Sequence, residues 1–192
     1  MKTQLIAIIV TFLFSSCKTN TSQKTSGSEA DVTNKVSSEI TFQVKAVEKE
    51  DLEIFEDGII PWISIKKPEL EIKNLIGKND IVLKTAKASL VIDYPLEKPV
   101  LIEIKSANAS GFTRKELVEI ISKVYHRIYQ EEEDSAQTKT VPISERQGLI
   151  NRNKTDGKYG IWGHDIDDLD LSSIVVKEKE NGRIELELFI ES

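Results

Sequence analysis

The fold class is decided by one stretch, Thr113–Ile128, which reads T-R-K-E-L-V-E-I-I-S-K-V-Y-H-R-I. Thr113 and Glu116 form the pattern T-x-x-E, a capping box in which each side chain accepts a free backbone N–H at the start of a helix. Phe112 precedes this cap and Leu117 occupies the fourth helical position, which is the arrangement of a hydrophobic staple. The apolar residues that follow share one helical face: Leu117, Ile120, Ile121, Val124, Tyr125 and Ile128. We therefore predict an amphipathic helix with one buried face.

Strands are predicted on both sides of this helix. Ahead of it, Glu39–Val47 alternates apolar and polar residues, and Ala88–Tyr94 and Pro99–Lys105 are two further strand-like runs. After it, Leu171–Lys179 and Arg183–Ile190 are joined by a short turn and predict a C-terminal hairpin. This order of elements predicts an α+β fold, with an antiparallel sheet of several strands and one main amphipathic helix lying across it.

The register of the hairpin follows from its charges and its apolar residues. A two-residue Asn-Gly loop would place Glu178 opposite Glu185, and like charges directly opposed are unfavourable. A three-residue loop with Gly182 in the left-handed conformation places Lys177 opposite Glu185 instead. The same loop also matches apolar residues, Val176 with Leu186 and Ile174 with Leu188. The sequence therefore favours the three-residue loop.

Between the helix and the hairpin, residues 131–170 predict a long loop. Glu131–Asp134 would lie at the negative end of the helix dipole, where acidic side chains are unfavourable. The helix is therefore expected to stop near Gln130, with the acidic run solvated; a cation site is the alternative. Residues 135–153 are polar and are expected to be disordered, whereas the part that follows is expected to be ordered.

The candidate site lies in the stretch Asn151–Leu171, which is rich in Gly, Asp and aromatic residues. Polar loops with glycine and aromatic residues are where proteins often place their sites. The candidate ligand-binding residues are Tyr159, Trp162, His164, Asp165 and Asp168.

Four interpretations of this stretch remain open. It binds a ligand or a protein partner; or His164 and neighbouring carboxylates hold a divalent cation, the only candidate cofactor. A third interpretation makes His164 the base of a hydrolase, with an Asp orienting it, and with Ser or water as the nucleophile. The fourth is structural: Asp side chains cap turns, glycines supply positive φ, and Ile161 and Trp162 fill the core.

The string Y-G-I-W-G-H-D-I-D-D-L, Tyr159–Leu169, with T-D-G-K before it, resembles a signature of a family of uncharacterised function. The resemblance covers about 20 residues. It implies where a site lies and implies no activity, cofactor or catalytic residue.

The beginning of the chain predicts a targeting segment. Leu5–Phe14 is apolar over ten residues, too short for a membrane-spanning helix, which needs about 20 residues. A short apolar core after Lys2 is typical of a signal peptide. Cys17, the only cysteine of the chain, follows two serines and resembles the lipidated cysteine of bacterial lipoproteins. This resemblance implies a signal peptide over residues 1–16 and a lipid anchor at Cys17, followed by a flexible tether over residues 17–38 and a single domain over residues 39–192.

The charge of the chain limits its partners. Its formal net charge is −6, and no basic cluster stands out in the sequence. Because binding to nucleic acid depends on lysine and arginine neutralising phosphates, a nucleic-acid partner is not expected. We predict a lipid-anchored protein of the bacterial cell envelope that acts as a binding or interaction module through residues 151–171. Its expected partners are the membrane, through Cys17, and an unidentified ligand or protein. The alternative is a hydrolase or metal-dependent enzyme centred on His164 and the neighbouring aspartates.

Overall fold

The structure is a computed structural model that describes residues 35–148 and 151–192, with only the backbone for residues 35–37. The predicted signal peptide, Cys17 and the tether as far as residue 34 lie outside the described residues. Within the described part, no helix is both long and apolar enough to cross a membrane.

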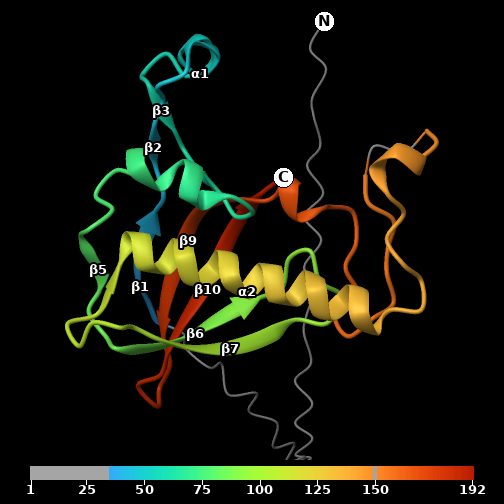
Figure 1. Cartoon of the computed structure of the whole chain (residues 1–192). Coiled ribbons are helices and arrows are strands. Elements are labelled where there is room, and N and C mark those ends of the chain that lie inside the picture. The colour runs from blue at the N-terminus through green and yellow to red at the C-terminus, as the bar shows by residue number, and fades with distance from the viewer. Residues whose placement is uncertain (1–34, 149–150) are drawn as a thin grey trace, which may run out of the picture. The chain divides into compact units, whose positions relative to one another are not determined.

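The described chain forms two layers, a mainly antiparallel sheet and one long helix that crosses its face (Figure 1). The strand order is β1-β9-β10-β6-β7, and a short strand, β4, also pairs with β9. The strands are β1 (Lys35–Thr41), β4 (Ile63–Ser64), β6 (Lys87–Ile92), β7 (Val100–Lys105), β9 (Asp170–Glu178) and β10 (Ile184–Glu191). All pairs are antiparallel except β10 with β6, which is parallel. The α+β prediction is confirmed, and this parallel pair is the departure from a purely antiparallel sheet.

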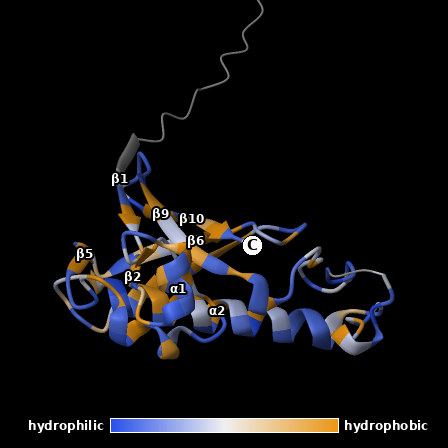
Figure 2. Ribbon diagram, turned by 90° about the horizontal axis from the view of Figure 1, so that it is seen from above, coloured by the Kyte–Doolittle hydropathy of each residue, from blue (hydrophilic) through white to orange (hydrophobic). Residues whose placement is uncertain are grey.

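Helix α2 (Arg114–Ser135) supplies one wall of the core. In Figure 2 it lies in a layer below the strands of the sheet. The side chains of the core come from its apolar face and from the sheet, and include Leu117, Ile121, Tyr125, Ile128, Leu90, Ile174 and Leu186. The predicted apolar face is therefore the buried one.

Half of the predicted capping box is present. The Thr113 Oγ1 accepts the Glu116 N–H at 3.1 Å, as expected of an N-cap. The Glu116 carboxylate does not return to the cap: it accepts the Ser106 hydroxyl at 2.9 Å and the Ala107 N–H at 2.6 Å. Glu116 therefore ties the start of the helix to the turn that follows β7.

The predicted register of the C-terminal hairpin is confirmed. Lys177 pairs with Glu185, and the apolar pairs are those expected, Val176 with Leu186 and Ile174 with Leu188. Gly182 has φ +76°, the left-handed conformation that the three-residue loop requires.

The smaller elements lie at the edges of this frame. The predicted strand over residues 39–47 is divided: β1 begins at Lys35 and β2 (Val44–Lys45) pairs with β3 (Ile59–Ile60). The last four residues of the predicted tether, 35–38, therefore belong to strand β1. The remaining elements are the helix α1 (Lys49–Ile54), the strands β5 (Ile81–Leu83) and β8 (Phe112–Thr113), and the 3₁₀ turns η1 (Pro68–Leu70), η2 (Ile72–Asn74), η3 (Ile143–Glu145) and η4 (Ile166–Asp168).

The prediction for the end of the helix is wrong. The helix does not stop near Gln130 but runs through the acidic residues to Ser135. The beginning of the segment after it, which was expected to be disordered, is held at residues 137, 138 and 141 by the side chains of residues 153 and 156. The bonds are those of Gln137 N and Thr138 N to Asp156 Oδ1, at 2.9 and 2.8 Å, and of Val141 N to Asn153 Oδ1, at 2.8 Å. The long loop thus spans residues 136–169.

Candidate functional site

A buried carboxylate, that of Glu132, fixes the first half of the candidate loop. Its side chain is fully buried and accepts four hydrogen bonds. One comes from the Thr155 hydroxyl at 2.6 Å, and three come from backbone N–H groups: Gly157 at 2.8 Å, Tyr159 at 2.7 Å and Gly160 at 3.1 Å. Burial opposes ionisation, but these bonds outweigh it and hold the pKa of Glu132 below its usual value. The acidic run therefore contains one fully buried carboxylate, which accepts hydrogen bonds from residues 155–160 of the loop.

The glycines of T-D-G-K-Y-G allow this close approach. A Cβ on Gly157 would lie 2.6 Å from the backbone oxygen of Glu132 and 2.7 Å from the Ser135 hydroxyl. Gly160 has φ +68°, a conformation that residues with side chains rarely adopt. Both positions therefore require glycine if the loop is to wrap around the end of α2.

The second half of the loop is attached to the turn after β6. Backbone hydrogen bonds join residues 159–162 to residues 95–98, and Leu96 and Ile161 form a bridge. The bonds are Trp162 N to Pro95 O at 3.2 Å, Glu97 N to Gly160 O at 3.0 Å and Lys98 N to Tyr159 O at 3.0 Å. The loop is thus held to the body on two sides.

The prediction that Trp162 fills the core is wrong. The buried side chains of the motif are those of Tyr159, Ile161 and Leu169, whereas Trp162 is 40% exposed. Alternating residues of an extended segment point in opposite directions, so burial of Ile161 turns its neighbour outward.

Trp162 belongs to a small aromatic cluster in which Tyr94 lies closest to both other rings. The Trp162 ring meets the Tyr94 ring edge-on at a centroid distance of 5.3 Å, and the His164 ring lies 5.6 Å from Tyr94 and 6.3 Å from Trp162. The Tyr129 hydroxyl, on helix α2, donates to the backbone oxygen of His164 at 2.9 Å and so ties that residue to the helix. We name Tyr94, Trp162 and His164 the aromatic cluster.

Next to the aromatic cluster lies a buried ion group. Arg146 donates two hydrogen bonds to the Asp165 carboxylate, at 2.6 and 3.0 Å, and Arg152 approaches the same carboxylate at 3.8 Å. The Arg152 guanidinium also lies 5.2 Å from the centroid of the Tyr129 ring. Asp168 accepts the backbone N–H of Asp165 at 2.9 Å, closing the capping box of η4. Asp165 and Asp168 therefore shape the loop, and neither carboxylate is bonded to the His164 ring in the described part of the chain.

The five aspartates of the stretch do not converge on one point. Asp156 holds residues 137 and 138, Asp165 binds the two arginines, Asp167 binds Lys66, Asp168 caps η4, and Asp170 lies in β9. Among the described residues, no group of three or more His, Cys, Asp or Glu side chains is arranged to hold a metal ion. The neighbours of the His164 ring are therefore aromatic side chains, and the carboxylates of the stretch are not gathered around it.

Sequence reasoning missed three residues of this site: Tyr94, Arg146 and Arg152. Tyr94 ends a predicted strand, Arg146 lies in a segment expected to be disordered, and Arg152 lies within the candidate stretch but was not among its candidate residues. Nothing local links Tyr94 to the loop; only the folded chain brings residues 94 and 162 together.

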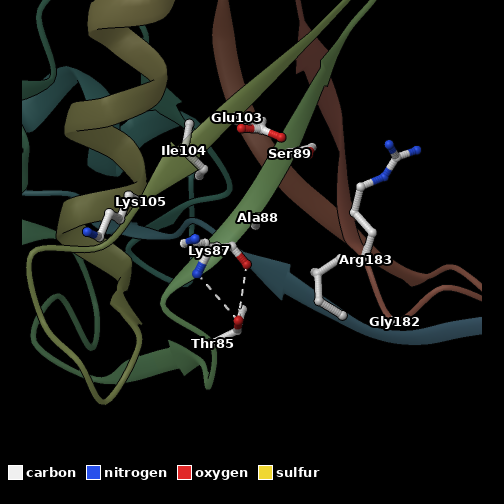
Figure 3. A pocket seen from close by; sticks show the side chains of 10 residues that line it. Thr85, Lys87, Ala88, Ser89, Glu103, Ile104, Lys105, Gly182 and Arg183 are labelled. Atoms are coloured by element: carbon white, nitrogen blue, oxygen red, sulfur yellow. Dashed lines mark hydrogen bonds between the residues drawn. The ribbon is translucent and has the colours of Figure 1, made fainter.

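A cavity of about 510 Å³ lies elsewhere, between β6, β7 and the turn of the C-terminal hairpin (Figure 3). Its three cationic side chains, those of Lys87, Lys105 and Arg183, point in different directions in Figure 3. Arg183 is already paired with Glu185. The cavity therefore offers no convergent set of charges for a ligand.

No family model matches this chain. Comparison with curated proteins and with solved structures gives no match either. The fold and the site thus define an α+β domain whose anchored loop presents an aromatic cluster at the surface.

Proposed function

We propose that this protein is a lipid-anchored binding module of the bacterial cell envelope, and that the aromatic cluster of its loop contacts a protein partner. The observation that carries the proposal is that Trp162 is exposed on a loop whose backbone is hydrogen-bonded to the buried Glu132 carboxylate. Tryptophan, tyrosine and arginine are enriched among the few residues that dominate the binding energy of protein interfaces. Tryptophan and tyrosine bury a large area with only two side-chain torsions.

The rigidity of the loop supports the same proposal. A segment that is ordered only on binding reduces affinity by the free energy needed to order it. Here Glu132 and the Arg146–Asp165 pair hold the loop before any partner arrives. Such a loop keeps the Trp162 ring in place and favours recognition of a preformed surface.

The alternative, an enzyme centred on His164, has less support. General base catalysis by histidine needs a partner that orients the ring and a nucleophile within hydrogen-bonding distance. The His164 ring contacts Tyr94 and Trp162, and the Asp165 carboxylate is engaged by arginine. The surroundings of His164 are therefore better suited to contact than to proton transfer.

The proposal is tested by photo-crosslinking in intact cells that produce the full-length chain. A photoreactive phenylalanine analogue replaces Trp162 in one variant and Phe189 in a control. Phe189 is a matched position because it is aromatic, 49% exposed and on β10, away from the loop. We expect a discrete crosslinked species from position 162 that position 189 does not give.

A second change makes the test specific. Tyr94→Ala, introduced beside the probe at position 162, removes the neighbouring ring of the cluster. We expect this change to reduce the crosslinked species. Equal crosslinking from positions 162 and 189, or none from 162, would reject the loop as the binding surface.

A further inference from the structure

A groove of about 640 Å³, which shares no residue with the aromatic cluster, is lined by residues of α1, the β2–β3 ribbon and the 3₁₀ turns η1 and η2, and by Asp170. Half of its lining residues are apolar, among them Val44, Phe55, Ile60, Trp62 and Leu70. The Phe55 and Trp62 rings meet edge-on at a centroid distance of 5.6 Å. A volume of this size and an aromatic wall are typical of sites for small organic molecules.

Two carboxylates, those of Glu71 and Asp170, complete the lining. Both residues are neighbours of Ser64: the Ser64 N–H donates to the Glu71 carboxylate at 2.9 Å, and the Ser64 backbone is in register with that of Asp170 in the β4–β9 pair. Neither carboxylate takes part in an ion pair among the described residues, although lysines at the exposed rim lie in the same groove. The charged residues of the lining are Lys45, Glu48, Asp51, Glu71, Lys73 and Asp170, with four acids against two lysines.

Ionisation of these two carboxylates is unfavourable, because both are partly buried and lie near other negative charges. Burial raises the pKa of Asp170 to about 6, and the negative charges of Glu71 and Glu191 add to the effect. Burial also raises the pKa of Glu71, against the lowering effect of the Ser64 N–H, and the charge of Asp51 adds a further increase. A cation placed between these groups would relieve both the repulsion and the lack of solvation.

The groove also opens onto an apolar rim. Three apolar residues of the lining are exposed: Ile54 by 70%, Leu70 by 63% and Val47 by 54%. Contiguous exposed apolar side chains usually mark a contact surface. The ligand therefore needs an apolar body as well as a positive charge.

We infer that this groove binds an organic ammonium ion with an apolar body, the charge lying at Glu71 and Asp170 and the body against Phe55, Trp62 and Leu70. Aromatic rings next to a carboxylate pair suit such a ligand, because a ring face attracts a cation while its surface covers the apolar part. The site is independent of the aromatic cluster around Trp162, so either proposal can fail without the other.

The inference is tested by titration calorimetry of the full-length chain in detergent. The probe is phenethylammonium, and 2-phenylethanol serves as its neutral counterpart of similar shape. We expect the ammonium ion to bind and the alcohol to bind at least about tenfold more weakly, the factor that corresponds to about 1.4 kcal/mol. Equal affinity for the two probes, or no binding of either, would overturn the inference.

Two variants locate the charge. Asp170→Asn and Glu71→Gln are each expected to weaken phenethylammonium binding about tenfold. Glu103→Gln is the matched control, because Glu103 is an exposed carboxylate on β7 outside the groove, and it should bind as the wild type does. Since Asp170→Asn removes a poorly solvated charge, this variant should melt at or above the temperature of the wild type at pH 7. Wild-type affinity in both groove variants, with the folds intact, would reject the assignment.

The pH dependence provides an independent readout. A cation binds the ionised form of Asp170, so affinity should rise with pH through about 6 and then level off, while the amine itself remains protonated. In the same range, binding should release protons, which calorimetry in two buffers of different ionisation enthalpy measures. Affinity that is flat between pH 5 and 7.5, with no proton release, would contradict the role of Asp170.

Discussion

At the scale of single residues, Glu132 links the main helix to the candidate loop. Its carboxylate accepts three backbone N–H groups and one hydroxyl in a fully buried position. A buried acceptor with this many donors contributes most when it is ionised, because hydrogen bonds to a charged acceptor are stronger than those to a neutral one.

We therefore expect Glu132→Gln to lower the free energy of unfolding by about 2–4 kcal/mol at pH 7, since the amide group turns an N–H toward backbone donors. Glu131→Gln is the control, because the Glu131 carboxylate is half-exposed and contacts Lys158 and Tyr159 at the surface. Urea denaturation at pH 7 measures both. Equal stability of the two variants would mean that Glu132 does not anchor the loop.

The same residue makes a prediction about pH. The pKa of Glu132 is lower in the folded chain than in the unfolded chain. Its contribution to stability is thus fully present above its unfolded pKa, roughly 4.3, and is lost as the pH falls through the folded value. The difference between wild type and Glu132→Gln should therefore shrink only in acid, below about pH 4. A difference that shrinks between pH 5 and 8 would exclude this carboxylate as its source.

Ile161 and Trp162 are neighbours in the sequence whose substitution by alanine is expected to have different effects. Ile161 is fully buried, and Ile161→Ala should lower the free energy of unfolding by about 2–5 kcal/mol. Trp162 is 40% exposed, and Trp162→Ala should lower it by no more than about 1.5 kcal/mol, through the lost contact with Tyr94. Chemical denaturation of the two variants is the measurement. The reverse order would place Trp162 in the core.

At the scale of secondary-structure elements, the start of α2 depends on a single hydroxyl. Thr113→Ala should lower the free energy of unfolding by about 0.5–2 kcal/mol, because the Glu116 N–H loses its acceptor. Thr41→Ala, at an exposed position of β1, is the control and should change it by less than about 0.5 kcal/mol. Denaturation midpoints that coincide for Thr113→Ala and wild type would exclude the cap.

The two ends of α2 show what the sequence could predict about elements. The start was predictable because its signal is local: the hydroxyl and its N–H partner are three residues apart. The end was not, because the residues that allow Glu132 to continue the helix follow 23 to 28 positions later. Judged locally, an acidic helix end is unfavourable, but distant N–H donors reverse this.

The strands show the same difference between features set by nearby residues and features set by distant ones. The register of the β9–β10 hairpin could be derived from charge and apolar matching within 20 residues. The parallel pairing of β10 with β6 joins residues almost 100 positions apart, and period-2 patterns do not choose between such partners. The candidate loop was located from its composition, but the outward direction of Trp162 depends on the bridge between Leu96 and Ile161.

At the scale of the whole molecule, the proposed sites need a body that stands free of the membrane. The aromatic cluster and the groove lie on different elements of the described domain. From the sequence we predict a polar tether between Cys17 and this domain, with a root-mean-square reach of about 25 Å if it behaves as a flexible coil. Such a reach would let both surfaces meet partners while the chain stays anchored.

The anchor itself gives the last prediction. A diacylglyceryl group at Cys17 would bring two acyl chains, and two chains hold a protein on a membrane stably where a single chain does so only marginally. We therefore expect the wild-type chain to partition into the detergent phase and Cys17→Ser to lose this partitioning, either as a soluble chain or as an unprocessed precursor. The double variant Cys17→Ser, Ser28→Cys is the control, because it keeps one cysteine but moves it away from the end of the signal segment. Phase partitioning and the mass of the processed chain measure the outcome. If Cys17→Ser is processed normally and still partitions into detergent, then the chain is not anchored through Cys17, and another feature must hold it at the membrane.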